Sequence, residues 1–136
     1  MAPLHARMAG HVDINLNGQD RSVDFAPGTS LLQLLRNELG LRSMKDGCAP
    51  EGSCGACTVI VDGRPVVSCA QPAERFEGKA IETLEGLPED ARDLWADAFS
   101  AMGASQCGYC TPGIVMKAEA LLRREAEPEQ DTITKA

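Results

Sequence analysis

The first half of the chain alternates between apolar and polar residues, a pattern that is typical of β-strands. Residues 11–17 form one such run and residues 21–25 a second, and Asn17-Gly18 between them is a strong hairpin turn. The apolar positions of the two runs are Val12, Ile14, Leu16, Val23 and Phe25. The pattern therefore predicts a β-hairpin that buries one face.

A helix is expected after the break at Pro27-Gly28. Thr29 or Ser30 can cap its first turn, and Gly40 can end it. Leucines recur between these positions at three- and four-residue steps, which places them on one helical face. They are Leu31, Leu34, Leu35 and Leu39.

Three further strands are predicted downstream. Residues 58–62 and 65–68 flank Asp62-Gly63, another favourable hairpin turn, and residues 79–84 supply a short strand. A small mixed sheet wrapped over one helix, in this order, is the β-grasp arrangement of plant-type ferredoxins. We expect such a domain over residues 11–87, after an N-terminal tail at residues 1–10.

After Gly86-Leu87-Pro88 the apolar residues change to helical periodicity. A helix is predicted over residues 89–102, in which Trp95 and Phe99 are expected to be core anchors. The apolar positions of this helix are Leu94, Trp95, Ala98, Phe99 and Met102.

A second downstream helix is predicted to run to about Glu125, with Thr111 as its cap and Pro112 in its first turn. A third is predicted to begin at Asp131. The residues that the second helix is expected to bury are Val115, Ala118, Leu121 and Leu122.

The composition is that of a small acidic globular protein. Its 136 residues carry a net charge of −7, and residues 74–97 hold eight acidic against three basic side chains. A nucleic acid or an anionic membrane is therefore disfavoured as a partner. No apolar run approaches the ~20 residues that span a bilayer, and the N-terminus has no apolar segment of signal-peptide length. The expected location is the cytoplasm.

Four cysteines fall within residues 48–69, in a loop punctuated by glycines. They are Cys48, Cys54, Cys57 and Cys69. Thiolates select iron–sulfur clusters, zinc or Cu(I), and three clustered cysteines with a distal fourth are the arrangement of a [2Fe–2S] centre. Such a core is anionic, and Gly47, Gly52 and Gly55 permit the sharp turns that aim backbone N–H groups at the sulfurs. In a reducing compartment a metal site is favoured over disulfides.

Cys107 and Cys110 form a separate Cys-x-x-Cys pair. On its own the pair is compatible with a redox dithiol, half of a zinc site or half of a second cluster. It lies between two predicted helices and just before a helix N-terminus, whose exposed amides and dipole suit an anionic iron–sulfur centre. The context favours a second cluster.

These motifs resemble those of a known family, the small iron–sulfur subunits, or N-terminal iron–sulfur regions, of the molybdenum hydroxylases. The family comprises xanthine dehydrogenases, aldehyde oxidoreductases and molybdenum–copper carbon monoxide dehydrogenases. The resemblance covers residues 11–136 and rests on Cys-Gly-Ala-Cys-Thr-Val, on Cys69 after eleven intervening residues, and on Gln-Cys-Gly-Tyr-Cys-Thr-Pro-Gly. It implies an α+β protein whose ferredoxin-like domain is followed by a helical-bundle iron–sulfur domain over residues 88–136.

The resemblance also implies two [2Fe–2S] clusters. The first would be held by the four cysteines of residues 48–69, and the second by Cys107 and Cys110 with a later Cys-x-Cys. Gln106 would lie close to molybdopterin, although a helix-terminal polar residue is the ordinary alternative. A large partner subunit would hydroxylate the substrate at its molybdenum centre. This chain would pass the electrons singly to FAD on another subunit, or to a different acceptor.

Two departures from the family pattern change these expectations. Five residues instead of four separate Cys48 from Cys54, and Pro50 among them has no N–H to donate. We expect this to alter the potential of the first cluster and not its assembly. No Cys-x-Cys follows Cys110 in the 136 residues, so the helical domain is expected to be partial. Its missing ligands would come from the large subunit or from a separated segment, unless the sequence is truncated or the second cluster has been lost.

Three classes of function remain open from the sequence. They are an electron-transfer subunit of a molybdenum hydroxylase, a stand-alone ferredoxin-like carrier, and a zinc-stabilised interaction module.

Overall fold

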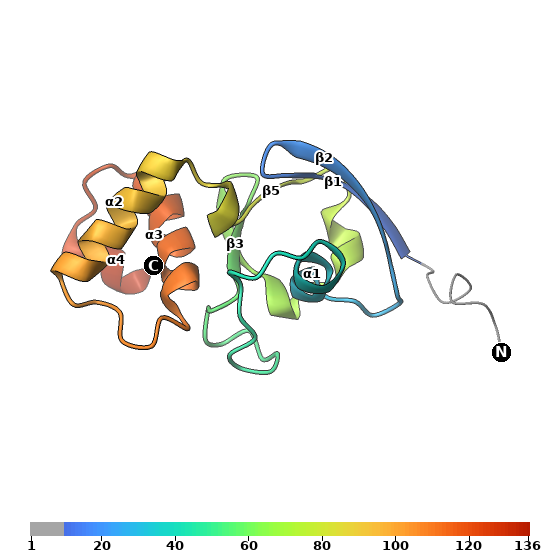
Figure 1. Ribbon diagram of the computed structural model, residues 1–136, viewed down its shortest axis with the longest axis horizontal. Helices are drawn as coiled ribbons and strands as arrows, with labels where there is room; N and C mark the ends of the chain where they lie inside the picture. Colours follow the sequence, from blue (N-terminus) through green and yellow to red (C-terminus); the bar gives the residue numbers. More distant parts are fainter. Residues whose placement is uncertain (1–9) are drawn as a thin grey trace.

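The computed structural model describes residues 10–136, which form a mixed β-sheet wrapped around a short helical segment and a layer of helices beside it (Figure 1). This confirms the predicted α+β class. The predicted tail, residues 1–10, lies outside the described residues except for Gly10, which is the first residue of strand β1.

The first hairpin is formed by β1 (Gly10–Leu16) and β2 (Gln19–Phe25), which pair antiparallel. Asn17 and Gly18 both take positive φ values, 52° and 82°, as a two-residue hairpin turn requires. The alternating apolar residues are all buried, which confirms the predicted inward face.

The predicted first helix is present but not α-helical throughout. It begins as α1 (Leu31–Gln33) and continues as a π-helical turn over Leu34–Glu38. The N-cap is Ser30, whose hydroxyl accepts from the Gln33 N–H, while the Gln33 side chain accepts from the Ser30 N–H. The first three leucines of the predicted stripe are fully buried and Leu39 is half-buried.

The second hairpin joins β3 (Thr58–Val61) to β4 (Arg64–Val67), and β5 (Ala80–Glu82) completes the sheet. The strand order is β2-β1-β5-β3-β4, with β5 parallel to β1 and antiparallel to β3. The central position of β5 is occupied by Ile81, which is paired with Leu16 on one side and Val61 on the other. The predicted order of strands and helix is confirmed.

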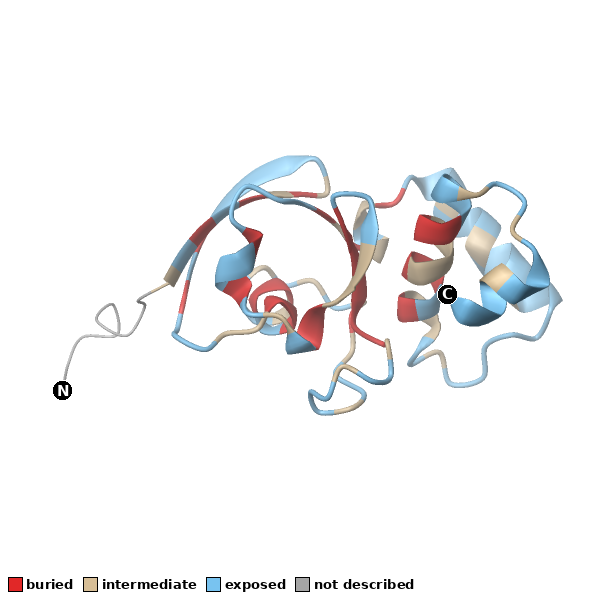
Figure 2. Ribbon diagram, turned by 180° about the vertical axis from the view of Figure 1, so that it is seen from behind, coloured by how far each residue is buried: buried red, intermediate tan, exposed pale blue. Residues whose placement is uncertain are grey.

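The helical layer contains α2 (Glu89–Ala101), α3 (Thr111–Arg124) and α4 (Gln130–Lys135), and α3 packs directly on β3. Figure 2 shows the buried face of α3 turned toward the sheet. Its core includes Ile60 of β3 and Leu87, together with Val115, Met116 and Ala120 of α3. Among residues 10–136 no helix is long and apolar enough to cross a membrane.

The predicted apolar faces of the two long helices are partly wrong. Leu94 and Met102 are 70% and 81% exposed and Ala98 is exposed as well, whereas the half-buried Trp95 and Phe99 pack against the core beside α3.

In α3 the face toward the sheet differs from the predicted stripe. Met116 and Ala120 are buried with the predicted Val115 and Leu121, whereas Ala118 is half-buried and Leu122 is exposed. The N-cap of α3 is Cys110 and not Thr111, whose hydroxyl instead pairs with that of Ser105 at 2.8 Å.

A polar clamp ties the helical layer to the sheet. Arg123 of α3 donates to both carboxylate oxygens of Glu82 in β5, at 2.9 and 3.0 Å, and its Nε donates to Glu119 at 3.0 Å. The second oxygen of Glu119 accepts from the Trp95 indole N–H at 2.8 Å. One guanidinium thus links β5, α3 and α2.

We predict that Arg123→Ala lowers the free energy of unfolding by about 1 kcal/mol, because a bidentate but partly exposed ion pair is lost. Chemical denaturation followed by the fluorescence of Trp95, the single tryptophan, measures this. Arg124→Ala removes the neighbouring arginine of the same helical turn and serves as the control. Equal effects of the two substitutions would contradict the clamp.

Candidate iron–sulfur sites

The β3–β4 hairpin brings Cys69 back beside Cys57. Cys57 immediately precedes β3, and Cys69 lies in the 3-10 turn Ser68–Ala70 that follows β4. The Cys69 N–H donates to the Cys57 sulfur at 3.4 Å, and the buried Ser68 hydroxyl donates to the Cys57 carbonyl at 2.7 Å. Both thiols are buried, so this pair lies under the protein surface.

Cys48 and Cys54 form a second, more open pair. The backbone N–H groups of Cys54 and Ser53 point at the Cys48 sulfur and lower the pKa of that thiol to about 6. The Ala56 N–H donates to the Cys54 sulfur at 3.4 Å. Cys48 is half-buried and Cys54 is exposed.

The two pairs lie close enough for their charges to interact. Burial and the neighbouring Cys57 thiol raise the pKa of Cys69 to about 12, and the charge of Cys48 acts in the same direction. The Gly52 backbone N–H opposes this shift, so it too points toward Cys69. Each of the four sulfurs therefore has at least one backbone N–H group acting on it, from residues 52–56 or from residue 69.

This geometry fits a dinuclear cluster, in which four thiolates are shared between two irons. Within residues 10–136 no three His, Cys, Asp or Glu side chains converge closely enough to hold one metal ion. A mononuclear zinc site needs four ligands around a single ion. Two neighbouring pairs of thiols with N–H donors on their sulfurs favour [2Fe–2S] over zinc.

The base of the cysteine loop is fixed from outside. The Lys45 N–H donates to the Ala56 carbonyl at 3.0 Å and closes the loop. Glu85, in the 3-10 turn Leu84–Gly86, accepts from the backbone N–H groups of Arg42 and Ser43 and from the Ser43 hydroxyl. Burial raises the pKa of Glu85, but these donors outweigh it and hold the value below its ordinary range. An ionised carboxylate thus anchors the approach to Cys48.

The additional loop residue bulges away from the sulfurs. Ala49, Pro50 and Glu51 are all exposed, and Ala49 takes a left-handed φ of 51° while its N–H donates to the Asp46 carboxylate at 2.9 Å. The N–H groups that point at sulfur come from residues after this bulge.

Cys107 and Cys110 lie at one end of the helical layer, and both are exposed. Gly108, at a φ of 78°, turns the chain between them, and Cys110 is the N-cap of α3. The first amides and the dipole of α3 therefore face this dithiol, which suits an anionic group. Gln106 precedes it and is also exposed. This loop carries two of the four thiols that a [2Fe–2S] centre takes, three residues apart.

Two residues that the sequence analysis did not single out join the sites. Gly113, in the first turn of α3, lies so close to the cysteine loop that a Cβ there would be 2.2 Å from the Gly55 carbonyl oxygen. The Tyr109 hydroxyl donates to the Asp46 carbonyl at 3.2 Å. A signal for Gly113 did exist, because glycine inside a helix costs about 1 kcal/mol relative to alanine and commonly marks close packing.

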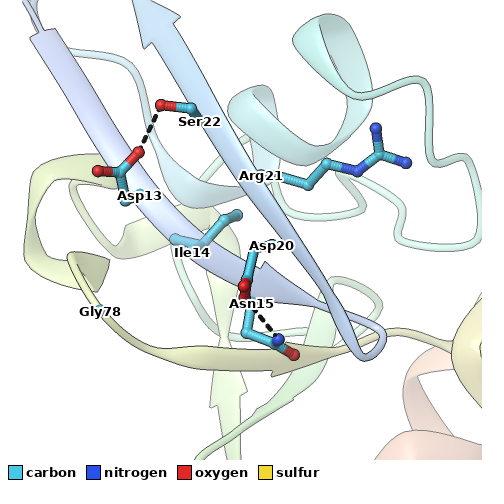
Figure 3. Close-up of a pocket in the computed structure, with 7 residues that line it drawn as sticks. All are labelled: Asp13, Ile14, Asn15, Asp20, Arg21, Ser22 and Gly78. Atoms are coloured by element: carbon cyan, nitrogen blue, oxygen red, sulfur yellow. Dashed lines mark hydrogen bonds between the residues drawn. The ribbon is translucent and has the colours of Figure 1, made fainter.

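A hollow on the β1–β2 hairpin is unrelated to the cysteines (Figure 3). Its polar side chains are bonded to each other, Ser22 to Asp13 and Asn15 to Asp20. These groups are exposed and already paired, so the hollow offers no additional chemistry.

Two family models match the chain. The "2Fe-2S iron-sulfur cluster binding domain" matches residues 14–85, and the "[2Fe-2S] binding domain" matches residues 83–136.

Known proteins match over nearly the whole chain. The nicotinate dehydrogenase small FeS subunit of Eubacterium barkeri is 47% identical, over 92% of this chain and 80% of its own length. The xanthine dehydrogenase iron-sulfur-binding subunit of Escherichia coli O157:H7 is 43% identical, over 90% and 75%. Among solved structures, quinoline 2-oxidoreductase from Pseudomonas putida 86 superposes with a TM-score of 0.85 at 34% identity, covering 95% of this chain and 79% of the matched chain.

Proposed function

Because the chain belongs to the family of small iron–sulfur subunits of the molybdenum hydroxylases, we propose that its six cysteines serve two [2Fe–2S] centres. It is an electron-transfer subunit of an oxidoreductase complex, and the substrate chemistry takes place on a partner chain. In our proposal the electrons come from a molybdenum–pterin centre on a large subunit. They leave to FAD on another subunit or to a different acceptor.

The observation that carries the proposal is the pairing of four thiols around inward-pointing amides. Cys48 and Cys54 would hold one iron of the first centre, and Cys57 and Cys69 the other. When bound, such a centre accepts and releases one electron at a time. The chain's own contribution is to stabilise the negative charge on the sulfurs through the N–H groups of residues 52–56 and 69. It makes and breaks no substrate bond.

The second centre would take Cys107 and Cys110 from this chain. The other cysteines are those of the first site, so two further ligands are drawn from polypeptide outside these 136 residues, on a continuation or on a partner subunit. Gln106 lies next to Cys107 on the exposed side of the loop, which supports its predicted place near the pterin. We also propose a cytoplasmic location, where thiols stay reduced and available as cluster ligands.

Neither alternative function gains support. A zinc module would need ligands converging on one ion, whereas the described thiols of the first site lie in two pairs. A stand-alone carrier would not be expected to align over nine-tenths of its length with small subunits of dehydrogenases.

We predict that Cys57→Ser abolishes or distorts the paramagnetic signal of the reduced first centre in the intact complex, because a buried thiolate ligand is lost. Electron paramagnetic resonance and iron analysis measure this. Ala70→Ser, which adds a hydroxyl beside Cys69 without removing a thiol, is the control and should leave the signal intact. An unchanged spectrum for Cys57→Ser would mean that the ligand set is wrong.

We also predict that the bulged loop sets the potential of the first centre. Pro50→Ala keeps the loop length and restores an N–H, and deleting Pro50 restores the four-residue interval. Deleting Pro50 removes the exposed bulge and changes how the following N–H groups approach the sulfurs, so it should shift the midpoint potential while iron content stays constant. Pro50→Ala is the matched control and should leave the potential unchanged, because its N–H lies on the bulge, away from the sulfurs. Redox titration of the intact complex measures this, and a midpoint that does not move on deletion of Pro50 would contradict the prediction.

A further inference from the structure

The contact between the two cysteine sites is made by a small number of groups. The Cys107–Cys110 loop and the start of α3 lie on the cysteine loop that precedes β3, and α3 itself packs on β3. The relative position of the two sites therefore depends on these contacts as well as on the cysteines.

The first contact is backbone against backbone. A Cβ on Gly113 would be 2.2 Å from the Gly55 oxygen and 2.9 Å from the Ala56 Cα. Neither neighbour is the end of a flexible side chain, so only glycine allows α3 to begin so close to the segment that separates Cys54 from Cys57. This contact fixes the distance between the start of α3, including Cys110, and the loop at Gly55 and Ala56.

The second contact is the Tyr109 side chain. Its hydroxyl donates to the Asp46 carbonyl, and its ring reaches Gly47. A Cβ on Gly47 would be 2.9 Å from the Cys54 sulfur and 3.4 Å from the ring carbon Cε1 of Tyr109. The Tyr109 ring and the Cys54 sulfur therefore lie on the same side of Gly47, both close to the position that a Cβ there would occupy. Tyr109 is also covalently next to Cys110, so it spans from one site to the other.

The other thiols of the first site are less accessible from this direction. Cys57 and Cys69 are 1% and 4% exposed and are covered by the hairpin, whereas Cys54 is exposed. The side chain that approaches from the helical layer reaches the most open of the four sulfurs.

We propose that Tyr109 is a positioning residue that holds the Cys107–Cys110 dithiol against Cys54 and makes Cys54 the thiol through which the two sites exchange electrons. The inference rests on the proposed function, that each site holds a [2Fe–2S] centre. One electron passes from the reduced centre to the oxidised one, and Tyr109 is neither oxidised nor reduced. Its ring supplies packed contact and fixed spacing, and its hydroxyl anchors the ring to Asp46.

The test uses the intact complex with Tyr109→Phe and Tyr109→Ala. Two readouts are taken beside iron content: the magnetic interaction between the two reduced centres, by electron paramagnetic resonance, and the rate of electron exchange between them after flash photoreduction. Tyr109→Ala should weaken the magnetic interaction and slow the exchange several-fold. Tyr109→Phe keeps the ring and should restore most of both.

The outcomes separate this inference from the proposed function. A wild-type complex without two [2Fe–2S] signals would overturn the proposed function itself. Two assembled centres whose interaction and exchange rate are the same in wild type and Tyr109→Ala would overturn the role of Tyr109 alone. If Tyr109→Ala loses iron, Tyr109→Leu, which keeps an apolar side chain, is measured with the same criteria. Gly113→Ala should disturb the same two readouts through the backbone contact.

Discussion

In the proposed first centre four thiols meet around an anionic group, and the arrangement of the sheet and of the helical layer follows from that constraint. Negative charge away from water has to be met by donors, and the nearest donors are the backbone N–H groups of the loop that carries the thiols. A loop alone supplies Cys48, Cys54 and Cys57. The fourth thiol comes from the β3–β4 hairpin, which returns the chain and leaves the Cys69 N–H on the Cys57 sulfur. The β3–β4 hairpin of the sheet thus brings the fourth thiol to the other three.

The helical layer depends on the same hairpin. α3 lies on β3, with Ile60 in the shared core, and its first turn contacts the loop at Gly55 and Ala56. The Arg123 clamp to Glu82 fixes the far end of α3 to β5. Because the helix is held at both ends, the dithiol at its N-terminus has a defined position relative to the first four cysteines. Electron transfer over a fixed distance requires this kind of rigidity.

Much of the fold could be predicted from the sequence, because local chemistry decides it. Asn17-Gly18 and Asp62-Gly63 strongly favour two-residue hairpin turns. The alternating strands beside them have one apolar face, which fixes their register. The capping box of Ser30 and Gln33 could be found, but the π-helical turn after it could not, since no local pattern marks the bond from the Leu39 N–H to the Leu34 carbonyl. The prediction for the apolar face of α2 was wrong because α3 covers only a small part of α2. That coverage is set by tertiary packing and not by the local sequence pattern. The candidate ligands could be predicted from the spacing of the cysteines. Their pairing, and the contacts of Tyr109 and Gly113, could not, because these join residues that are distant in the sequence.

The central claim is that this chain supplies all four ligands of one [2Fe–2S] centre and two ligands of a second. Iron and acid-labile sulfide are counted on the chain of residues 1–136 reconstituted alone and on the complete assembly, with metal identity checked in both. The account predicts two irons and two sulfides on the isolated chain, and four of each per copy of the chain in the assembly. Four irons in two ordinary clusters on the isolated chain, or only two in the assembly, would contradict it.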